Sequence, residues 1–279
     1  MRLYHRLMPD DKRRSAPRRP QQGGRKQYGR NSGKGRTTAS DRADREARAR
    51  GGDRHVEERP RKPWSPQSGQ LPKWISDQLA RVTPKAKLAA TTEHLMAAAT
   101  FFSTGKYGKS LSEAQQAKEL SPRDATIREI LALSAYRLGR WDMALAELRT
   151  FRRFTGENTH MPVEMDVLRA LDRPKDVEEV WRAFSKMDPG MRETRNEAKV
   201  VFGSFLLDRG NARKAWEVTN PKKMKAEPEE SELRTWYVAA KAAHELGDTQ
   251  TARQLLEAIE RVDIAFPGLD ELGRTLRND

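Results

Sequence analysis

A spacing of 34 residues recurs in the middle of the chain and constrains its fold more than any other feature. The segment that begins Gly105-Lys-Tyr107 returns as the segment that begins Gly139-Arg-Trp141, 34 residues later. A fixed period of this length indicates one small structural unit stacked on copies of itself. Glycine at the repeated position has no β-carbon, so it can adopt a positive φ and turn the chain at little cost. The sequence therefore predicts a repeat protein.

Further residues of the period follow an ordered pattern of small, aromatic and proline positions. After Gly105 and Tyr107 come Ser110, Ala114 and Pro122, and the second copy has Ala144 in the place of Ser110. This pattern resembles the tetratricopeptide repeat (TPR) family, in which a small residue early in the second helix lets the two helices of a unit touch. The resemblance covers roughly residues 85–265. It implies an all-α fold: a right-handed α-solenoid of about five helix pairs.

The five predicted units differ in how well they match the pattern. In the third unit, Asp172 stands where glycine is expected and Pro174 where the aromatic residue is expected. In the fourth, Asn220-Pro221 is expected to end the second helix early, and a charged insertion follows. We place the units at about 91–124, 125–157, 158–190, 196–225 and 231–265, within a body that runs from 85 to 279.

Two flanking segments are predicted to cover the ends of the array. Apolar residues recur at helical spacing over 71–84, which predicts a leading helix that caps the first unit. An amphipathic helix that is not attached to the array is the alternative for this segment. Leu269, Leu272 and Leu276 predict a C-terminal cap. An unrelated helical bundle with accidental periodicity remains the alternative for the whole body.

The N-terminal segment 1–70 differs from the rest in charge and composition. Residues 1–63 carry 20 Lys and Arg against 8 Asp and Glu, whereas the remaining 216 residues carry 34 against 32. With few large apolar residues, the segment cannot bury enough surface to offset its ordering entropy, which predicts a disordered basic arm. The arm resembles Arg/Gly-rich RNA-binding tails. Its candidate polyanion-binding residues are Lys12, Arg13, Arg14, Arg18, Arg19, Arg25, Lys26, Arg30, Lys34 and Arg36.

Alternatives to RNA binding remain open for the arm. Only Tyr4 and Tyr28 could stack on bases, so affinity is expected to come from counterion release and to be sensitive to salt. A solubilising tail, or one attracted to any polyanion including anionic lipid, fits the same composition.

The TPR resemblance also implies where a protein partner would bind. In that family the first helices of the units line a concave groove that holds a peptide or a helix of another protein. The candidates for this groove are Tyr136, Arg137, Arg169, Tyr237, Lys241 and His244, since Tyr and Arg are frequent interface anchors. Solvated helix faces are the alternative for each. The Lys and Asn clamp of the co-chaperone members of the family is absent, because Leu95, Ala99, Glu129 and Leu133 stand at its positions.

No sequence motif indicates catalysis. The chain has no cysteine, which excludes disulfides and Cys-ligated zinc. The stretch from Gly105 to Ser110 ends like a phosphate-binding P-loop, but Ser103 stands where its first glycine is required. His5, His55, His94, His160 and His244 show no metal-ligand spacing. We therefore expect no enzyme, no cofactor and no metal.

Two function classes remain after these exclusions. The first is a non-enzymatic adaptor of the bacterial TPR type that binds another protein in its groove. The second is an RNA- or ribosome-associated factor that gains nucleic-acid affinity from the arm. No run of about 18 apolar residues is present, so no membrane span is expected, and a cytoplasmic location is predicted.

Overall fold

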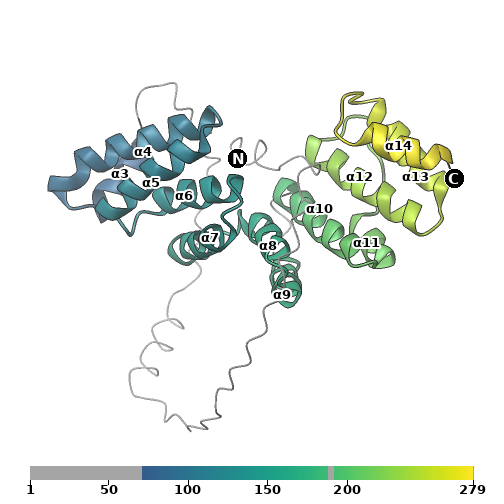
Figure 1. The fold of residues 1–279 in the computed structure, drawn as a ribbon, viewed down its shortest axis with the longest axis horizontal. Helices are drawn as coiled ribbons and strands as arrows, with labels where there is room; N and C mark the ends of the chain where they lie inside the picture. Colours follow the sequence, from purple (N-terminus) through teal and green to yellow (C-terminus); the bar gives the residue numbers. More distant parts are fainter. Residues whose placement is uncertain (1–70, 188–191, 279) are drawn as a thin grey trace, which may run out of the picture. The chain divides into compact units, whose positions relative to one another are not determined.

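The computed structural model describes residues 71–187 and 192–278, and within these ranges the chain is all-helical, with twelve α-helices, one 3-10 helix and no strand (Figure 1). This confirms the predicted all-α fold for that part of the chain. The predicted arm, 1–70, lies outside the described residues. The helices are α3 (Lys73–Val82), η3 (Lys85–Lys87), α4 (Leu88–Ser103), α5 (Tyr107–Leu120), α6 (Ala125–Arg137), α7 (Trp141–Thr155), α8 (Met161–Ala170), α9 (Pro174–Phe184), α10 (Arg192–Asp208), α11 (Ala212–Thr219), α12 (Glu230–Glu245), α13 (Thr249–Glu260) and α14 (Leu269–Asn278).

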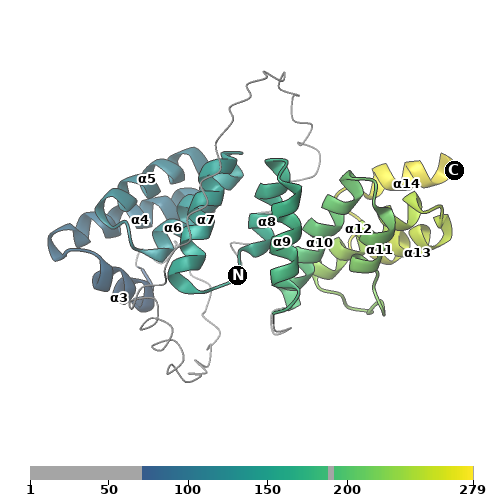
Figure 2. The same ribbon diagram turned by 90° about the horizontal axis from the view of Figure 1, so that it is seen from below.

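Helices that follow one another in the sequence pack against one another. The pairs α4–α5, α6–α7, α8–α9, α10–α11 and α12–α13 are in contact, and each pair also contacts the next (Figures 1 and 2). We call these pairs units one to five, and we call the first helix of each unit helix A and the second helix B. Helices A also touch across units, as α10 does with both α8 and α12.

One backbone arrangement closes the turn between helix A and helix B in all five units. The turn residue has a left-handed backbone, with φ of 74° at Gly105, 69° at Gly139, 50° at Asp172, 68° at Gly210 and 81° at Gly247. The N–H of the next residue donates to the carbonyl five positions earlier, as in Arg140 to Ala135 at 2.9 Å and Arg173 to Leu168 at 2.9 Å. The turn residue itself donates to the carbonyl three positions earlier. Together these bonds form a Schellman motif, which satisfies carbonyls that the end of a helix leaves without a partner.

Unit three adopts the common turn although its sequence departs from the pattern. Asp172 is the only non-glycine residue with a positive φ in the described part of the chain. Aspartate tolerates the left-handed region better than most residues, because its short polar side chain can hydrogen-bond locally. Asp172 also lies 3.5 Å from Arg209 of unit four, through Oδ1 and the guanidinium nitrogen.

The residue five positions after each turn residue lies at the contact between helices A and B. These residues are Ser110, Ala144, Val177, Ala215 and Ala252, and each is 0% exposed. Small side chains at this place let the two helices approach closely. Ser110 uses its hydroxyl here as well, donating to the carbonyl of Ala98 at 2.8 Å and lying 2.8 Å from the hydroxyl of Ser134 in unit two.

Unit four depends on a glycine within helix A. A β-carbon on Gly203 would lie 2.6 Å from Thr219 of α11 and 2.9 Å from Val238 of α12. Helix α10 therefore approaches both neighbours at a point where no larger residue fits without displacement.

Both ends of the array are covered by an additional helix. At the N-terminal end, Ile75 and Leu79 of α3 are buried, and α3 contacts α4. At the C-terminal end, Leu272 and Leu276 of α14 are buried against the cluster that includes Ile259 of α13. These helices lie where the sequence predicted a leading and a final cap.

Replacement of Asp172 by glycine tests the energetic role of the turn conformation. Asp172→Gly should raise the free energy of unfolding by about 1 kcal/mol, because glycine removes the strain of a β-carbon at positive φ. Asp172→Ala keeps the β-carbon and removes the same contact with Arg209, so it should lower stability instead. Urea unfolding followed by circular dichroism measures both, and equal effects of the two substitutions would contradict the assigned turn.

Candidate protein-binding surface

The first group of predicted groove residues lies at the C-terminal ends of α6 and α8. Tyr136 is 2% exposed, its hydroxyl donates to Asp166 Oδ2 at 2.5 Å, and its ring meets that of Trp141 edge-on at 5.9 Å. The structure therefore places this predicted groove residue in a buried position rather than on an accessible face. Its hydroxyl instead links helix A of unit two to helix A of unit three.

Arg169 continues the same line of polar contacts into unit four. Its guanidinium lies 3.6 Å from Asp166 Oδ1, and its Nε donates to Asp208 Oδ2 at 2.5 Å. Asp166 is nearly fully buried, whereas Asp208 is about half exposed. The structure thus brings Tyr136 and Arg169 together through a carboxylate that sequence reasoning did not select. We call Tyr136, Asp166, Arg169 and Asp208 the inter-unit relay, because they join α6, α8 and α10.

Arg137 lies next to the inter-unit relay but contacts unit one. Its guanidinium carbon lies 4.6 Å from the ring centroid of Tyr107, at the start of α5. A cation over an aromatic ring at this distance is attracted by the electron density of the ring face. Arg137 is half-buried, so part of the side chain still reaches solvent.

The second group of predicted residues lies on one face of α12. Tyr237, Lys241 and His244 follow at intervals of four and three, and all three are half-buried. The hydroxyl of Tyr237 donates to the carbonyl of Gly268 at 3.3 Å, so the connector before α14 covers part of this residue. The side chains of Lys241 and His244 remain partly accessible to solvent.

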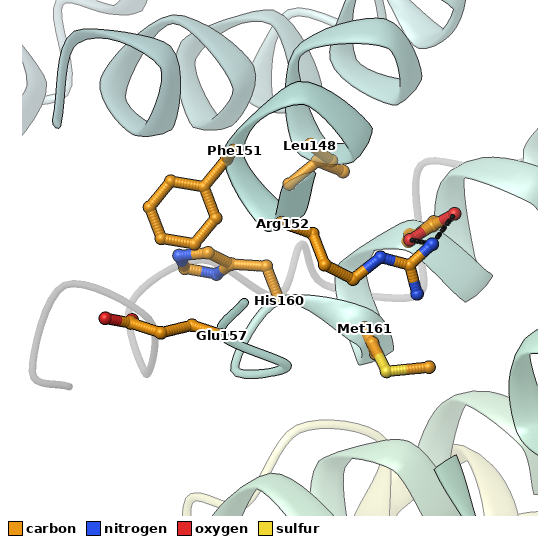
Figure 3. Close-up of a pocket in the computed structure, with 7 residues that line it drawn as sticks. Leu148, Phe151, Arg152, Glu157, His160 and Met161 are labelled. Atoms are coloured by element: carbon orange, nitrogen blue, oxygen red, sulfur yellow. Dashed lines mark hydrogen bonds and ion pairs between the residues drawn. The ribbon is translucent and has the colours of Figure 1, made fainter. Parts of the chain in front are cut away.

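A crevice lies at the junction of α7 and α8 (Figure 3). Phe151 of α7 meets the ring of His160 edge-on at 5.2 Å, and Glu164 of α8 binds Arg149 at 3.0 Å and Arg152 at 3.3 Å. The lining side chains leave no space that a water molecule could occupy. The crevice is therefore a closely packed contact between units two and three. In it, two arginines balance the charge of the buried Glu164 carboxylate.

His94, His160 and the P-loop-like stretch are used in packing, whereas His5 and His55 lie outside the described residues. His94 lies 2.7 Å from Glu113, and His160 lies 2.7 Å from Glu129. Gly105 forms the turn of unit one, and Ser110 is buried at the helix contact, so this stretch cannot cradle a phosphate.

Within residues 71–187 and 192–278, no three His, Asp or Glu side chains lie close enough together to hold a metal ion. None of the helices described has the length and apolar character needed to cross a membrane. The ten candidate basic residues of the arm lie outside the described residues.

A buried carboxylate between units four and five was not predicted from the sequence. Glu197 of α10 is fully buried, and its Oε1 lies 3.4 Å from Arg234 of α12, which pairs more closely with Glu230 at 2.6 Å. Its other oxygen has no hydrogen-bond partner among the described residues. Burial, with smaller contributions from Glu230 and Glu193, raises the pKa of Glu197 from 4.5 to about 7, although Arg234 opposes this shift.

No protein-family model matches the chain. No curated protein is similar enough in sequence to be counted as a relative.

Glu197→Gln tests how the burial of the Glu197 carboxylate affects stability. Because the pKa of Glu197 is higher in the folded state, its contribution to stability is present below pH 4.5 and is lost as pH rises to about 7. Glutamine cannot ionise, so the stability difference between variant and wild type should grow across this window to roughly 3 kcal/mol at pH 8. Urea unfolding at several pH values measures it. Glu227→Gln, at an exposed position, is the control, and a difference that does not change with pH would contradict the assignment.

Proposed function

We propose that the chain is a TPR-type adaptor that binds a peptide or a helix of another protein along the helices A of its units. The observation that carries this proposal is the common turn of the five units, with the same left-handed residue and the same two hydrogen bonds. Helix pairs repeated in this way are the building blocks of α-solenoids, whose stacked helices present extended binding surfaces. The right-handed superhelix and its groove are part of the proposal.

The face of α12 is the part of this surface that we assign to the partner. Tyr237 and Lys241 combine an aromatic ring with a cation, and His244 lies one turn further along the same helix. Partly exposed aromatic and cationic side chains of this kind are enriched in interface hot spots. Arg137 at the end of α6 supplies a second cation. The inter-unit relay fixes the spacing of the helices between these two places.

The proposed adaptor is not an enzyme and requires no cofactor, and we place it in the cytoplasm. The buried side chains of the described residues take part in helix packing and in ion pairs between units, as Glu164 does with Arg149 and Arg152. Such pairs hold neighbouring helices together and leave the outer side chains for recognition.

A second candidate function is association with RNA. The observation that favours it is the charge of residues 1–63, with 20 Lys and Arg against 8 Asp and Glu. Contacts between these cations and phosphates release counterions. A plot of the logarithm of the binding constant against the logarithm of the salt concentration should therefore have a slope of about −0.7 for each single-strand phosphate contacted.

In-cell crosslinking followed by affinity purification of the full-length chain distinguishes the two functions. Lys241→Glu should reduce the yield of crosslinked protein partner about tenfold or more, as expected for a hot-spot residue. The partner should remain after nuclease treatment. Lys214→Glu makes the same charge change at an exposed position of α11 and is the control. A partner that is lost on nuclease treatment and unaffected by Lys241→Glu would overturn the adaptor proposal and favour RNA association.

A further inference from the structure

Arg234 of α12 lies between two carboxylates that differ greatly in exposure. Its Nη1 is 3.4 Å from Oε1 of Glu197, and its Nη2 is 2.6 Å from Oε1 of Glu230. The Glu197 side chain is 1% exposed, whereas the Glu230 side chain is 61% exposed. The arginine thus forms a close ion pair with the carboxylate that water can solvate, and only a long contact with the carboxylate that water cannot reach.

These distances indicate that the two carboxyl groups carry different charges. An ionised carboxylate that is buried needs a close cationic partner, because burial removes its water. Charge-assisted N–H···O bonds measure about 2.7–2.9 Å, and the contact of Glu197 with Arg234 is longer. Oε2 of Glu197 has no hydrogen-bond partner in the described part of the chain. The arrangement therefore fits a protonated Glu197 beside an ionised Glu230.

Charged groups on α10 and α12 face Glu197. Glu193 precedes it by four residues on α10, which places the two side chains on the same face of the helix. Arg234 and Glu230 face it from α12. Burial raises the pKa of Glu197 to about 7, the charges of Glu230 and Glu193 act in the same direction, and Arg234 opposes them.

The other helices that pack against α10 direct their charges elsewhere. On α8, the buried carboxylates Glu164 and Asp166 accept hydrogen bonds from Arg149 and Tyr136. The charged side chains of α9 and α11 are exposed, apart from the half-buried Asp176, which Arg173 binds; the exposed ones are Lys175, Glu178, Glu179, Arg182, Arg213, Lys214 and Glu217. Arg234 is thus the cation that responds to the charge of Glu197.

We propose that Glu197 and Arg234 form a pH switch at the contact between units four and five. When Glu197 loses its proton to solvent, Arg234 leaves Glu230 and forms a close ion pair with Glu197. The movement is small, because shortening the Nη1–Oε1 distance from 3.4 Å to about 2.8 Å completes the new pair. Glu230 is exposed, so water solvates its carboxylate after the arginine has left, and the loss of this surface ion pair costs little.

The switch changes the charge on the face of α12 that we assign to the partner. Tyr237 and Lys241 follow Arg234 by three and seven residues, which places all three on one side of the helix. Closing the pair with Glu197 withdraws a cation from this face and leaves Glu230 there as an anion. The surface charge that a partner meets therefore becomes more negative as pH rises through about 7. This link to a partner rests on the proposed function, whereas the exchange of Arg234 does not.

An NMR titration of the full-length chain tests the exchange. The chain is labelled at its Glu carboxyl groups and Arg guanidinium groups and is followed between about pH 5 and pH 9. Glu197→Gln and Arg234→Gln identify the two signals by their loss. In the wild type, the Glu197 carboxyl signal should titrate with a midpoint of about 7, and the Arg234 guanidinium signal should shift with the same midpoint.

Glu230→Gln separates the exchange from a simple effect of burial. It removes the closest carboxylate of Arg234 and one negative charge near Glu197, so the midpoint of Glu197 should fall by about one pH unit or more. Arg234→Gln should raise this midpoint by a similar amount. Glu257→Gln is the matched control, because Glu257 is also an exposed carboxylate that pairs with an arginine four residues later, Arg261, at 3.8 Å. It should leave the midpoint unchanged, and circular dichroism should remain helical in all variants.

Three results would overturn the switch. They are a Glu197 midpoint near 4.5, an Arg234 signal that does not follow the titration of Glu197, and equal Glu197 midpoints in the wild type and Glu230→Gln. If the titration confirms the exchange but Lys241→Glu does not reduce partner capture, the failure lies in the proposed function alone.

Discussion

The left-handed residue between helices A and B is the constraint on which the rest of the structure depends. It reverses the chain in the same way in each unit, because the same two backbone hydrogen bonds flank it at Gly105, Gly139, Asp172, Gly210 and Gly247. Once the turn is set, the residue five positions later must face helix A at close range. That position is filled by residues that are 0% exposed in every unit. The regular packing of the helix pairs is thus a consequence of the turn.

Ion pairs then specify which helices become neighbours. Glu147 of α7 is bound by Lys118 of α5 and Arg128 of α6, both at 2.6 Å. Glu164 repeats this arrangement between α7 and α8 with two arginines. Buried ion pairs add little net stability, but breaking one leaves an uncompensated charge, which is strongly unfavourable. These ion pairs therefore destabilise an arrangement with a displaced helix more than they stabilise the native arrangement.

Much of the backbone could be predicted from the sequence, because period and turn chemistry are local properties. The glycine positions and the small residues after them could be found by spacing alone. Asp172 departs from the expected glycine, yet the chain turns there in the same way, because aspartate tolerates the left-handed region better than most residues. The inter-unit relay could not be predicted, since Tyr136 and Asp166 are 30 residues apart and meet only when two units are stacked. The pKa of Glu197 likewise depends on burial between units, which no local pattern reveals.

The central claim is that helices α4 to α13 of the described residues form five helix pairs, each stabilised by contact with its immediate neighbours. Amide hydrogen exchange, followed helix by helix in the wild type and in Ala144→Arg, tests this most directly. The substitution places a charge at a fully buried contact between α6 and α7. We predict that protection falls in α6 and α7 and in their neighbours α5 and α8, while α12 and α13 retain theirs. Equal loss of protection in all helices, or no loss in α6 and α7, would contradict the account.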